Sequence, residues 1–264
     1  MNRFGWFGLF FLFLGQLAGW SLPVEEGGQR LAEFYDSLDV ENLWLAGKKV
    51  HWKTGEPLPG DRPGKTHCSA FVAAACSRLG IYILRPPAHG QELLANAQAE
   101  WLKTKGAEHG WKPAESPVEA QRLANQGHPV AVVFQNPDPQ KPGHIALVRP
   151  SDLDEQRLAS DGTWVIQAGQ HNHRCCTLKK GFKNHPGAWN NAGDYQVKFF
   201  FNQTSFRKKS GDKRIATKGT SIVNRTTLTM SQNVFYETSP SILKLNLVTA
   251  AIAIAAACAF CGHY

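Results

Sequence analysis

One run of small and apolar residues, residues 66–80, constrains the fold of this chain more than any other stretch. Its apolar residues recur at the spacing of one helical face, and Gly80 stands where a helix ends. The residues on that face are Phe71, Val72, Ala75, Cys76 and Leu79. The run therefore predicts a buried helix, and Cys68 begins it.

Cys68 occupies the first turn of that expected helix. The first backbone N–H groups of a helix have no partner within it, and the helix dipole is positive there, so both favour a thiolate. We therefore expect the pKa of Cys68 to lie below the usual value of about 8.5, as in a nucleophile. A cysteine among small residues is more often a packed side chain or half of a disulfide. Residues elsewhere in the chain are therefore needed to distinguish a structural cysteine from a nucleophile.

Two later stretches supply partners for a reactive thiol. In residues 142–148, His144 opens an apolar strand, and residues 163–169 form a second strand that carries the amide of Gln167. Nucleophilic catalysis by cysteine needs a base and a group that orients the base. Cys68, His144 and Gln167 fit these three roles, and Asn172, just past the second strand, is the alternative for the third.

The order of the expected elements predicts an α+β fold. Helices are expected at residues 29–38, 68–79, 91–102 and 117–126, the last of them capped by Ser116 with Glu119 at the capping-box position. Strands are expected at residues 129–134, 144–149, 163–168 and 195–201. Residues 48–64 are interpreted as an irregular loop, and Asp161-Gly162 as a turn. Because helices come first and strands follow, we expect an antiparallel sheet covered by helices.

Three further polar or aromatic residues are candidates for contacting substrate. Trp52 lies in the loop before the cysteine helix, His89 follows that helix, and Asn172 follows the second strand. A loop-anchoring or structural role is the more common one for such residues, and both readings stay open here.

The N-terminal residues 1–21 have the features of an export signal. Asn2-Arg3 supplies a basic start, residues 6–14 are apolar, and small residues follow at Ala18, Gly19 and Ser21. An uncleaved membrane anchor is the alternative. A periplasmic or secreted location follows from either reading, and disulfides are permitted there.

The rest of the chain divides into two parts. Residues 22–205 form the expected folded domain, and residues 206–264 are a tail of unknown role. The tail begins with a basic linker, residues 207–214, and ends with an uncharged run, residues 245–260. That run is compatible with a membrane contact, a buried helix or an inert tail.

Charge and cysteine content narrow the class of protein. The net charge of +8 in 264 residues indicates an anionic partner, and no basic stripe interleaved with aromatic residues points to nucleic acid. Six cysteines are too few for a disulfide scaffold, although one pair among Cys76, Cys175 and Cys176 is compatible with export. His171 and His173 lie too close to those cysteines for a tetrahedral zinc site, so no metal or cofactor is expected.

The cysteine and histidine stretches together resemble the motifs of the papain-like cell-wall amidases and peptidases of the NlpC and CHAP families. The resemblance rests on Cys68-Ser69-Ala70-Phe71-Val72 and on Gly143-His144-Ile145-Ala146-Leu147-Val148. It covers residues 27–201 in the order of elements and is specific at these two motifs. The family's third catalytic position lies near the end of the next strand, which is where Gln167 stands.

The resemblance implies a papain-like domain in which N-terminal helices, the nucleophile helix among them, pack on an antiparallel sheet. It also implies an exported cysteine amidase or endopeptidase that cleaves peptidoglycan peptides through a thioester on Cys68, with His144 as base and Gln167 as its orienting residue. No metal or cofactor takes part. The backbone N–H of Cys68 would be one donor to the oxyanion, a contribution worth about 3 kcal/mol in other systems.

Two alternatives remain from the sequence. One is an acyltransferase of related fold, in which an amine rather than water resolves the thioester. The other is a wall-binding or membrane-tethered module whose cysteine is structural, which a disulfide from Cys68 to Cys76 or Cys175 would favour.

Overall fold

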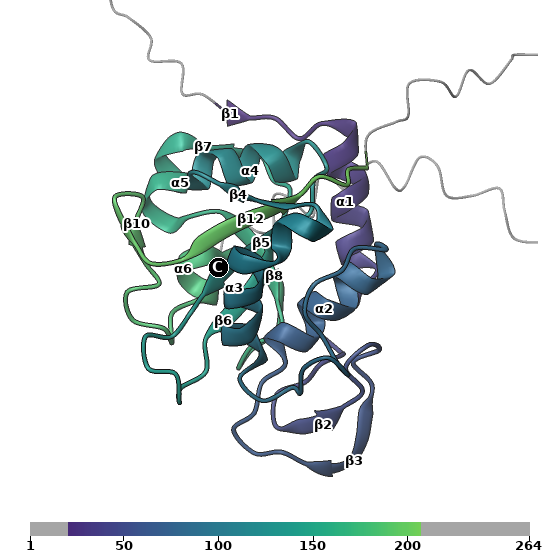
Figure 1. The fold of residues 1–264 in the computed structure, drawn as a ribbon. Coiled ribbons are helices and arrows are strands. Elements are labelled where there is room, and N and C mark those ends of the chain that lie inside the picture. Colours follow the sequence, from purple (N-terminus) through teal and green to yellow (C-terminus); the bar gives the residue numbers. More distant parts are fainter. Residues whose placement is uncertain (1–20, 207–264) are drawn as a thin grey trace, which may run out of the picture.

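The computed structural model describes residues 21–206, in which helices cover both faces of an antiparallel sheet (Figure 1). This confirms the expected mixture of helices and antiparallel sheet. The export signal in residues 1–20, the basic linker and the uncharged run of the tail lie outside the described residues.

The main sheet has six strands in the order β4-β12-β5-β6-β8-β9, and every neighbouring pair is antiparallel. Its strands are β4 (Trp111–Ala114), β5 (Val130–Phe134), β6 (His144–Val148), β8 (Trp164–Gln167), β9 (His173–Thr177) and β12 (Lys198–Asn202). The helices are α1 (Glu26–Asp36), α2 (Cys68–Arg78), α3 (Leu94–Thr104), α4 (Pro117–Asn125), α5 (Glu155–Asp161), α6 (Leu178–Gly181) and the 3-10 helix η1 (Gly106–His109).

Successive side chains along each strand point to opposite faces of the sheet, which divides the hydrophobic core into two layers. One face of the sheet packs against α1, α2 and α3, and the other face packs against α4, α6 and the segment after α6. In β6, Ile145 and Leu147 belong to the first layer, whereas Ala146 and Val148 belong to the second. This is the period of two that a sheet buried on both faces requires.

Helix α2 begins at Cys68 as expected and is buried along most of its length. All residues from Cys68 to Cys76 are buried, which explains the run of alanines, because small side chains allow α3 and the sheet to approach closely. The helix ends before Gly80, whose φ of 71° is a left-handed conformation that favours glycine.

Helix α4 has the predicted cap. The Ser116 hydroxyl accepts the backbone N–H of Glu119 at 3.1 Å, and Pro117 takes the first helical position. The Glu119 carboxylate accepts the backbone N–H of Glu115 at 2.7 Å, one residue earlier than in an ordinary capping box.

Three expectations about secondary structure are wrong. Residues 48–64 are not an irregular loop, because β2 (Lys48–Val50) and β3 (Pro57–Asp61) form a hairpin. All five residues of β3 are exposed, so no apolar alternation marks it. The strand expected at residues 195–201 is divided, since β11 (Asp194–Tyr195) pairs with β10 (Trp189–Asn191) and only β12 joins the main sheet.

The third difference lies before β8, where Asp161 ends α5 rather than forming an isolated turn. The Asp154 carboxylate caps this helix by accepting the backbone N–H of Arg157 at 2.7 Å, and Gly162 follows it with a φ of 77°. Asp154 also ends β7 (Leu153–Asp154), which pairs with β1 (Ser21–Leu22).

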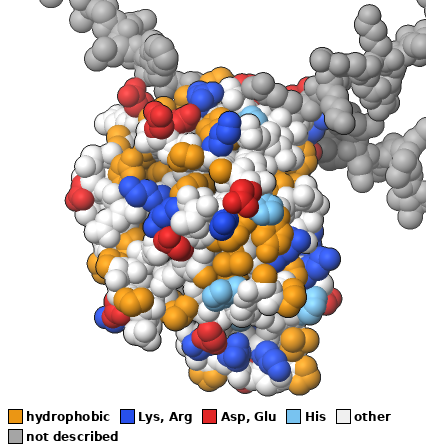
Figure 2. Space-filling view, in the orientation of Figure 1, with side chains coloured by type: hydrophobic (Ala, Val, Ile, Leu, Met, Phe, Trp, Pro, Cys, Tyr) orange, Lys and Arg blue, Asp and Glu red, His pale blue; other side chains and the backbone are white. Residues whose placement is uncertain are grey.

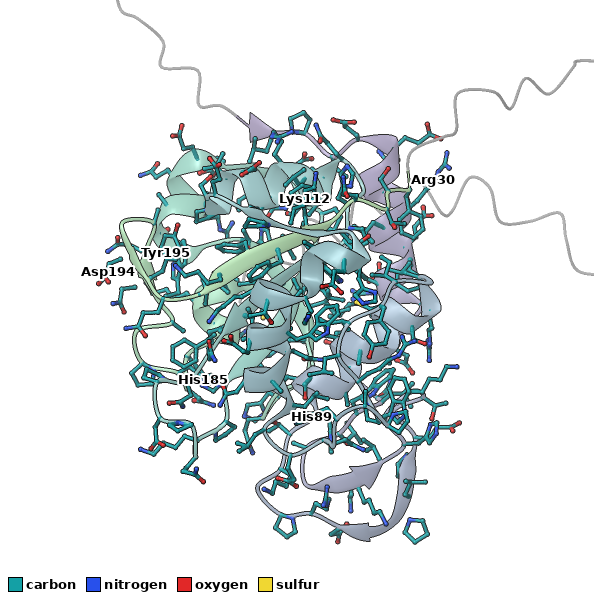
Figure 3. All side chains as sticks on the ribbon, in the orientation of Figure 1. Arg30, His89, Lys112, His185, Asp194 and Tyr195 are labelled. Carbon is teal, nitrogen blue, oxygen red and sulfur yellow. The ribbon has the colours of Figure 1, made fainter. Side chains whose placement is uncertain are left out.

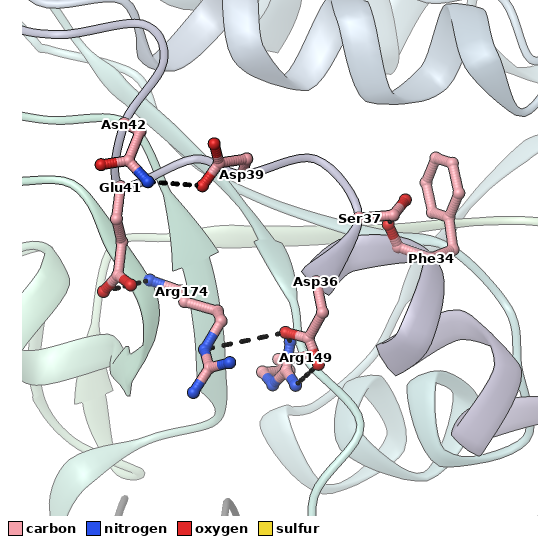
Figure 4. A network of polar contacts seen from close by, with 8 residues as sticks. All are labelled: Phe34, Asp36, Ser37, Asp39, Glu41, Asn42, Arg149 and Arg174. Atoms are coloured by element: carbon pink, nitrogen blue, oxygen red, sulfur yellow. Dashed lines mark hydrogen bonds and ion pairs between the residues drawn. The ribbon is translucent and has the colours of Figure 1, made fainter. Parts of the chain in front are cut away.

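Ion pairs join the end of α1 to the sheet (Figure 4). The Asp36 carboxylate accepts a hydrogen bond from Nη2 of Arg149 at 2.9 Å, its other oxygen lies 2.9 Å from Nη1, and Nε of Arg174 lies 3.8 Å away. Arg149 follows β6 and its side chain is mostly buried, so this ion pair fixes α1 against that end of the sheet. Within residues 21–206, no helix has the length and apolar content needed to cross a membrane.

Candidate active site

The register of the sheet brings Gln167 within reach of His144. In β6 and β8, Leu147 pairs with Ile166 and Val148 pairs with Val165. This register continues to place Gln167 opposite Ala146, two residues from His144 and on the same face of the sheet. Such diagonal neighbours lie about 7–8 Å apart at their backbones, a distance that long side chains bridge.

A hydrogen bond joins the two side chains, between Nε2 of His144 and Oε1 of Gln167. The amide nitrogen of Gln167 donates to the backbone carbonyl of His171 at 3.4 Å, which fixes the amide oxygen on the side of the imidazole. The proton of the neutral imidazole is therefore on Nε2, and the lone pair on Nδ1 can accept a second proton.

Two rings that the sequence did not single out enclose His144. Phe182 meets it edge-on, with ring centroids 4.5 Å apart and an interplanar angle of 73°. His185 stacks on it, with centroids 5.2 Å apart and planes at 13°. Both follow α6, about 40 residues after His144, so only the contact in space reveals them.

Cys68 lies at the end of β6 that His144 opens. The backbone N–H of Ile145, the next residue after His144, lies close enough to the Cys68 thiol to favour its ionised form, as do the N–H groups of Ser69 and of Cys68 itself. The structure thus brings the start of α2 and the start of β6 together. The preceding His67 holds this helix start in place, because its Nε2 bonds the Lys48 carbonyl at 2.8 Å.

The expectation of a lowered pKa for Cys68 is wrong in this structure. Burial raises the pKa of the thiol, and the hydrogen bonds from Ile145, Ser69 and Cys68 offset part of that rise. Burial also lowers the pKa of His144 to about 4, against the hydrogen bond to Gln167, which raises it. At neutral pH the two groups are therefore a thiol and a neutral imidazole rather than an ion pair.

This protonation state predicts how the thiol reacts. We expect alkylation of Cys68 by iodoacetamide to accelerate by about tenfold per pH unit between about pH 7 and pH 9, because the thiolate is the reactive form. Mass spectrometry of the modified peptide measures the rate. A rate that is constant over this range would show a preformed thiolate–imidazolium pair and contradict the expectation.

The loop that leads into His144 is clamped by Asn96 of α3. The Asn96 amide donates to the Lys141 carbonyl at 2.9 Å and accepts the Asn136 N–H at 3.0 Å. Gly143 passes so close that a Cβ there would overlap Asn96 Oδ1 and the Phe134 carbonyl oxygen. The glycine before the histidine therefore has a steric reason, and Asn96 positions the start of β6.

The structure gives Trp52, His89 and Asn172 local structural contacts. The Trp52 ring packs against the first core layer, with the Arg85 guanidinium 6.0 Å from its centroid. His89 bonds the carbonyl of its neighbour Gly90 at 2.7 Å and lies low on the loop between α2 and α3, whereas His185 lies farther to the left (Figure 3). A role of Trp52 or His89 in binding substrate stays a prediction.

The side chain of Asn172 makes its hydrogen bonds away from His144. Its amide nitrogen donates to the carbonyls of Val40 at 2.7 Å and Leu43 at 2.8 Å, which ties the loop after α1 to the turn between β8 and β9. Of the two candidates for the third role, Gln167 is the one that the structure places on His144.

Cys68 and Cys76 are free thiols, so neither expected pairing that involves Cys76 is formed. Burial raises the pKa of Cys76 to about 12, as for a packed apolar side chain. Among residues 21–206, no cluster of three or more histidine, cysteine, aspartate or glutamate side chains is arranged to hold a metal ion. Neither protein-family models nor curated protein sequences show a match to this chain.

Proposed function

We propose that this chain is a papain-like cysteine hydrolase that cleaves amide bonds, with Cys68 as nucleophile, His144 as base and Gln167 as the residue that orients the base. The observation that carries the proposal is the packing of α2 against β6, which brings the Ile145 N–H near the Cys68 thiol. Cys68, His144 and Gln167 are separated by 76 and 23 positions in the sequence. The hydrogen bond between His144 and Gln167 supports the orienting role that we propose for Gln167.

The acylation step follows from the protonation states. His144 Nδ1 accepts the proton of the Cys68 thiol as the sulfur attacks the carbonyl carbon of the amide, and the carbonyl electrons move to the oxygen. The backbone N–H of Cys68 is at the helix start and is a donor available to that oxyanion. Because the resting pair is neutral, proton transfer accompanies the attack.

Collapse of the tetrahedral intermediate completes the cycle. The C–N bond breaks, His144 returns its proton to the departing amine, and a thioester remains on Cys68. Water then loses a proton to His144 and attacks the thioester, which releases a carboxylic acid and restores the thiol. Throughout, the Gln167 amide oxygen accepts a hydrogen bond from Nε2–H and stabilises the imidazolium when it forms.

Peptidoglycan peptides are the substrate class we propose. The support is the resemblance of the two motifs to NlpC and CHAP enzymes, the export signal expected in residues 1–21, and the net charge of +8, which suits an anionic polymer. Basic and acidic side chains are interspersed on the face shown in Figure 2, an arrangement unlike the basic stripe of a nucleic-acid surface. A periplasmic or secreted location, with the tail as a membrane contact, belongs to the same proposal.

One observation favours the second candidate, a wall-binding module with a structural cysteine. Cys68 is only 5% exposed and His144 only 4%, and burial opposes formation of the thiolate. A purely structural cysteine, however, does not explain the hydrogen bond between His144 and Gln167, which orders the imidazole at the start of β6, the strand that α2 packs against.

Digestion of purified peptidoglycan distinguishes these candidates. The mature protein under mild reductant is expected to release new amines and shortened stem peptides, read by mass spectrometry, and alkylation with iodoacetamide beforehand is expected to stop this release. An intact polymer to which untreated and alkylated protein bind equally would contradict the hydrolase and support the binding module. Transfer to an added amine, with little hydrolysis, would identify an acyltransferase.

A further inference from the structure

His185 is held in a defined position against His144. It lies in the turn between α6 and β10, where its backbone N–H donates to the Phe182 carbonyl at 2.8 Å and its carbonyl accepts the Ala188 N–H at 3.0 Å. The Phe134 ring of β5 lies 5.4 Å from the His185 ring, and the His144 ring lies parallel to it at 5.2 Å. Backbone and ring contacts together fix this half-buried side chain.

Stacking restricts the rotation of His144. One flank of the imidazole meets the edge of Phe182, and a flat face meets the plane of His185. Rotation of the His144 ring about its Cβ–Cγ bond would drive it into one of these neighbours, because packed interiors leave no room for a ring flip without displacement. The ring is thereby kept in the orientation that directs Nε2 to Gln167.

The protonation state of His185 is compatible with its position against the His144 ring. Burial first, and then the charge of His144, lower the pKa of His185 to about 4. The ring is therefore neutral at neutral pH, and its π face can accept the imidazolium that His144 becomes during catalysis. Of the three rings packed against His185 in the described residues, those of Phe134, Phe182 and His144, only His144 can carry a charge.

We propose that His185 is a positioning residue for the reaction, whose ring stacks on His144 and holds the base in its productive orientation. This inference rests on the proposed function, since the base is needed only if the thiol is a nucleophile. His185 acts through the shape and neutrality of its ring, so a flat apolar ring should replace it and a small side chain should not.

The experiment compares His185→Ala and His185→Phe in the mature protein. For release of peptidoglycan fragments, we expect His185→Ala to lower kcat by about tenfold and to leave KM within about twofold of the wild-type value. The reason is that a loosely held imidazole is displaced from its catalytic position by less than the length of a bond. His185→Phe is expected to keep kcat within about threefold. His109→Ala is a matched control, because His109 also packs between two rings, those of Tyr82 and Trp101, in another part of the fold.

A measurement without substrate separates this inference from the proposed function. Nitrogen NMR of the imidazoles reports the tautomer of His144, expected as a single form with the proton on Nε2 in the wild type and in His185→Phe, and as a mixture in His185→Ala. A single form in His185→Ala, or equal impairment of kcat in the Phe and Ala variants, would overturn the positioning role. If the wild type releases no fragments, the proposed function fails, and the tautomer of His144 still decides whether His185 orders it.

Discussion

Cys68→Ala is expected to lower the rate of amide hydrolysis by at least about 10⁴-fold, because no other group in the site replaces the sulfur that forms the thioester. The backbone contacts of residue 68 do not depend on its side chain, so the variant should fold and bind peptidoglycan as the wild type does. The rate of fragment release and the circular dichroism spectrum measure the two effects.

Cys76→Ala is the matched control for that variant. Cys76 lies on the same helix, is fully buried, and is also a free thiol. Loss of its sulfur leaves a small cavity, for which we expect a cost of about 1 kcal/mol in the free energy of unfolding and activity within about twofold of the wild type. Equal activity of Cys68→Ala and wild type would refute the role of Cys68, and inactivation by both substitutions would point to a loss of packing.

Gly143→Ala is expected to impair both activity and stability. The added Cβ would overlap the Phe134 carbonyl oxygen, which is backbone, and Asn96 Oδ1, which clamps the loop before β6. This overlap is relieved only if the start of β6 moves, and His144 would then move with it. We expect a loss of about 100-fold in kcat/KM and of about 2 kcal/mol in the free energy of unfolding.

Gly90→Ala tests whether this loss is specific to the position. Gly90 lies in the loop before α3, and a Cβ there would meet no atom within 4 Å. Activity and melting temperature should therefore match the wild type. Because the Phe134 carbonyl remains in the way, adding Asn96→Ala to Gly143→Ala should not restore activity. A Gly143→Ala variant as active as the wild type would show that β6 tolerates the displacement.

Local signals made much of the fold predictable. The bounds of α2, the Ser116 cap of α4 and the strand beginning at His144 depend on residues within a few positions of one another, and the structure has all three. The β2–β3 hairpin was not predictable, because an exposed strand shows no apolar alternation. Helix α5 was missed because only its Leu158 is buried.

The candidate site, like the fold, was predictable from the sequence only in part. Sequence indicated Cys68 at a helix start and His144 at a strand start, but not whether Gln167 or Asn172 reaches the histidine. That choice depends on the register between β6 and β8, which long-range pairing sets. The register puts Gln167 on the face of His144, while the carbonyls of Val40 and Leu43 engage Asn172.

By itself, the sequence determined which residues are candidates for the proposed chemistry, because side-chain type and the ends of helices and strands are local properties. Only the tertiary structure decided how those residues are protonated and held. Burial, which no local pattern encodes, raises the pKa of Cys68 and lowers that of His144, and so favours a neutral thiol in place of the thiolate expected from the helix start. Packing likewise placed His185 on the His144 ring, since ring contacts between distant segments exist only once the chain has folded.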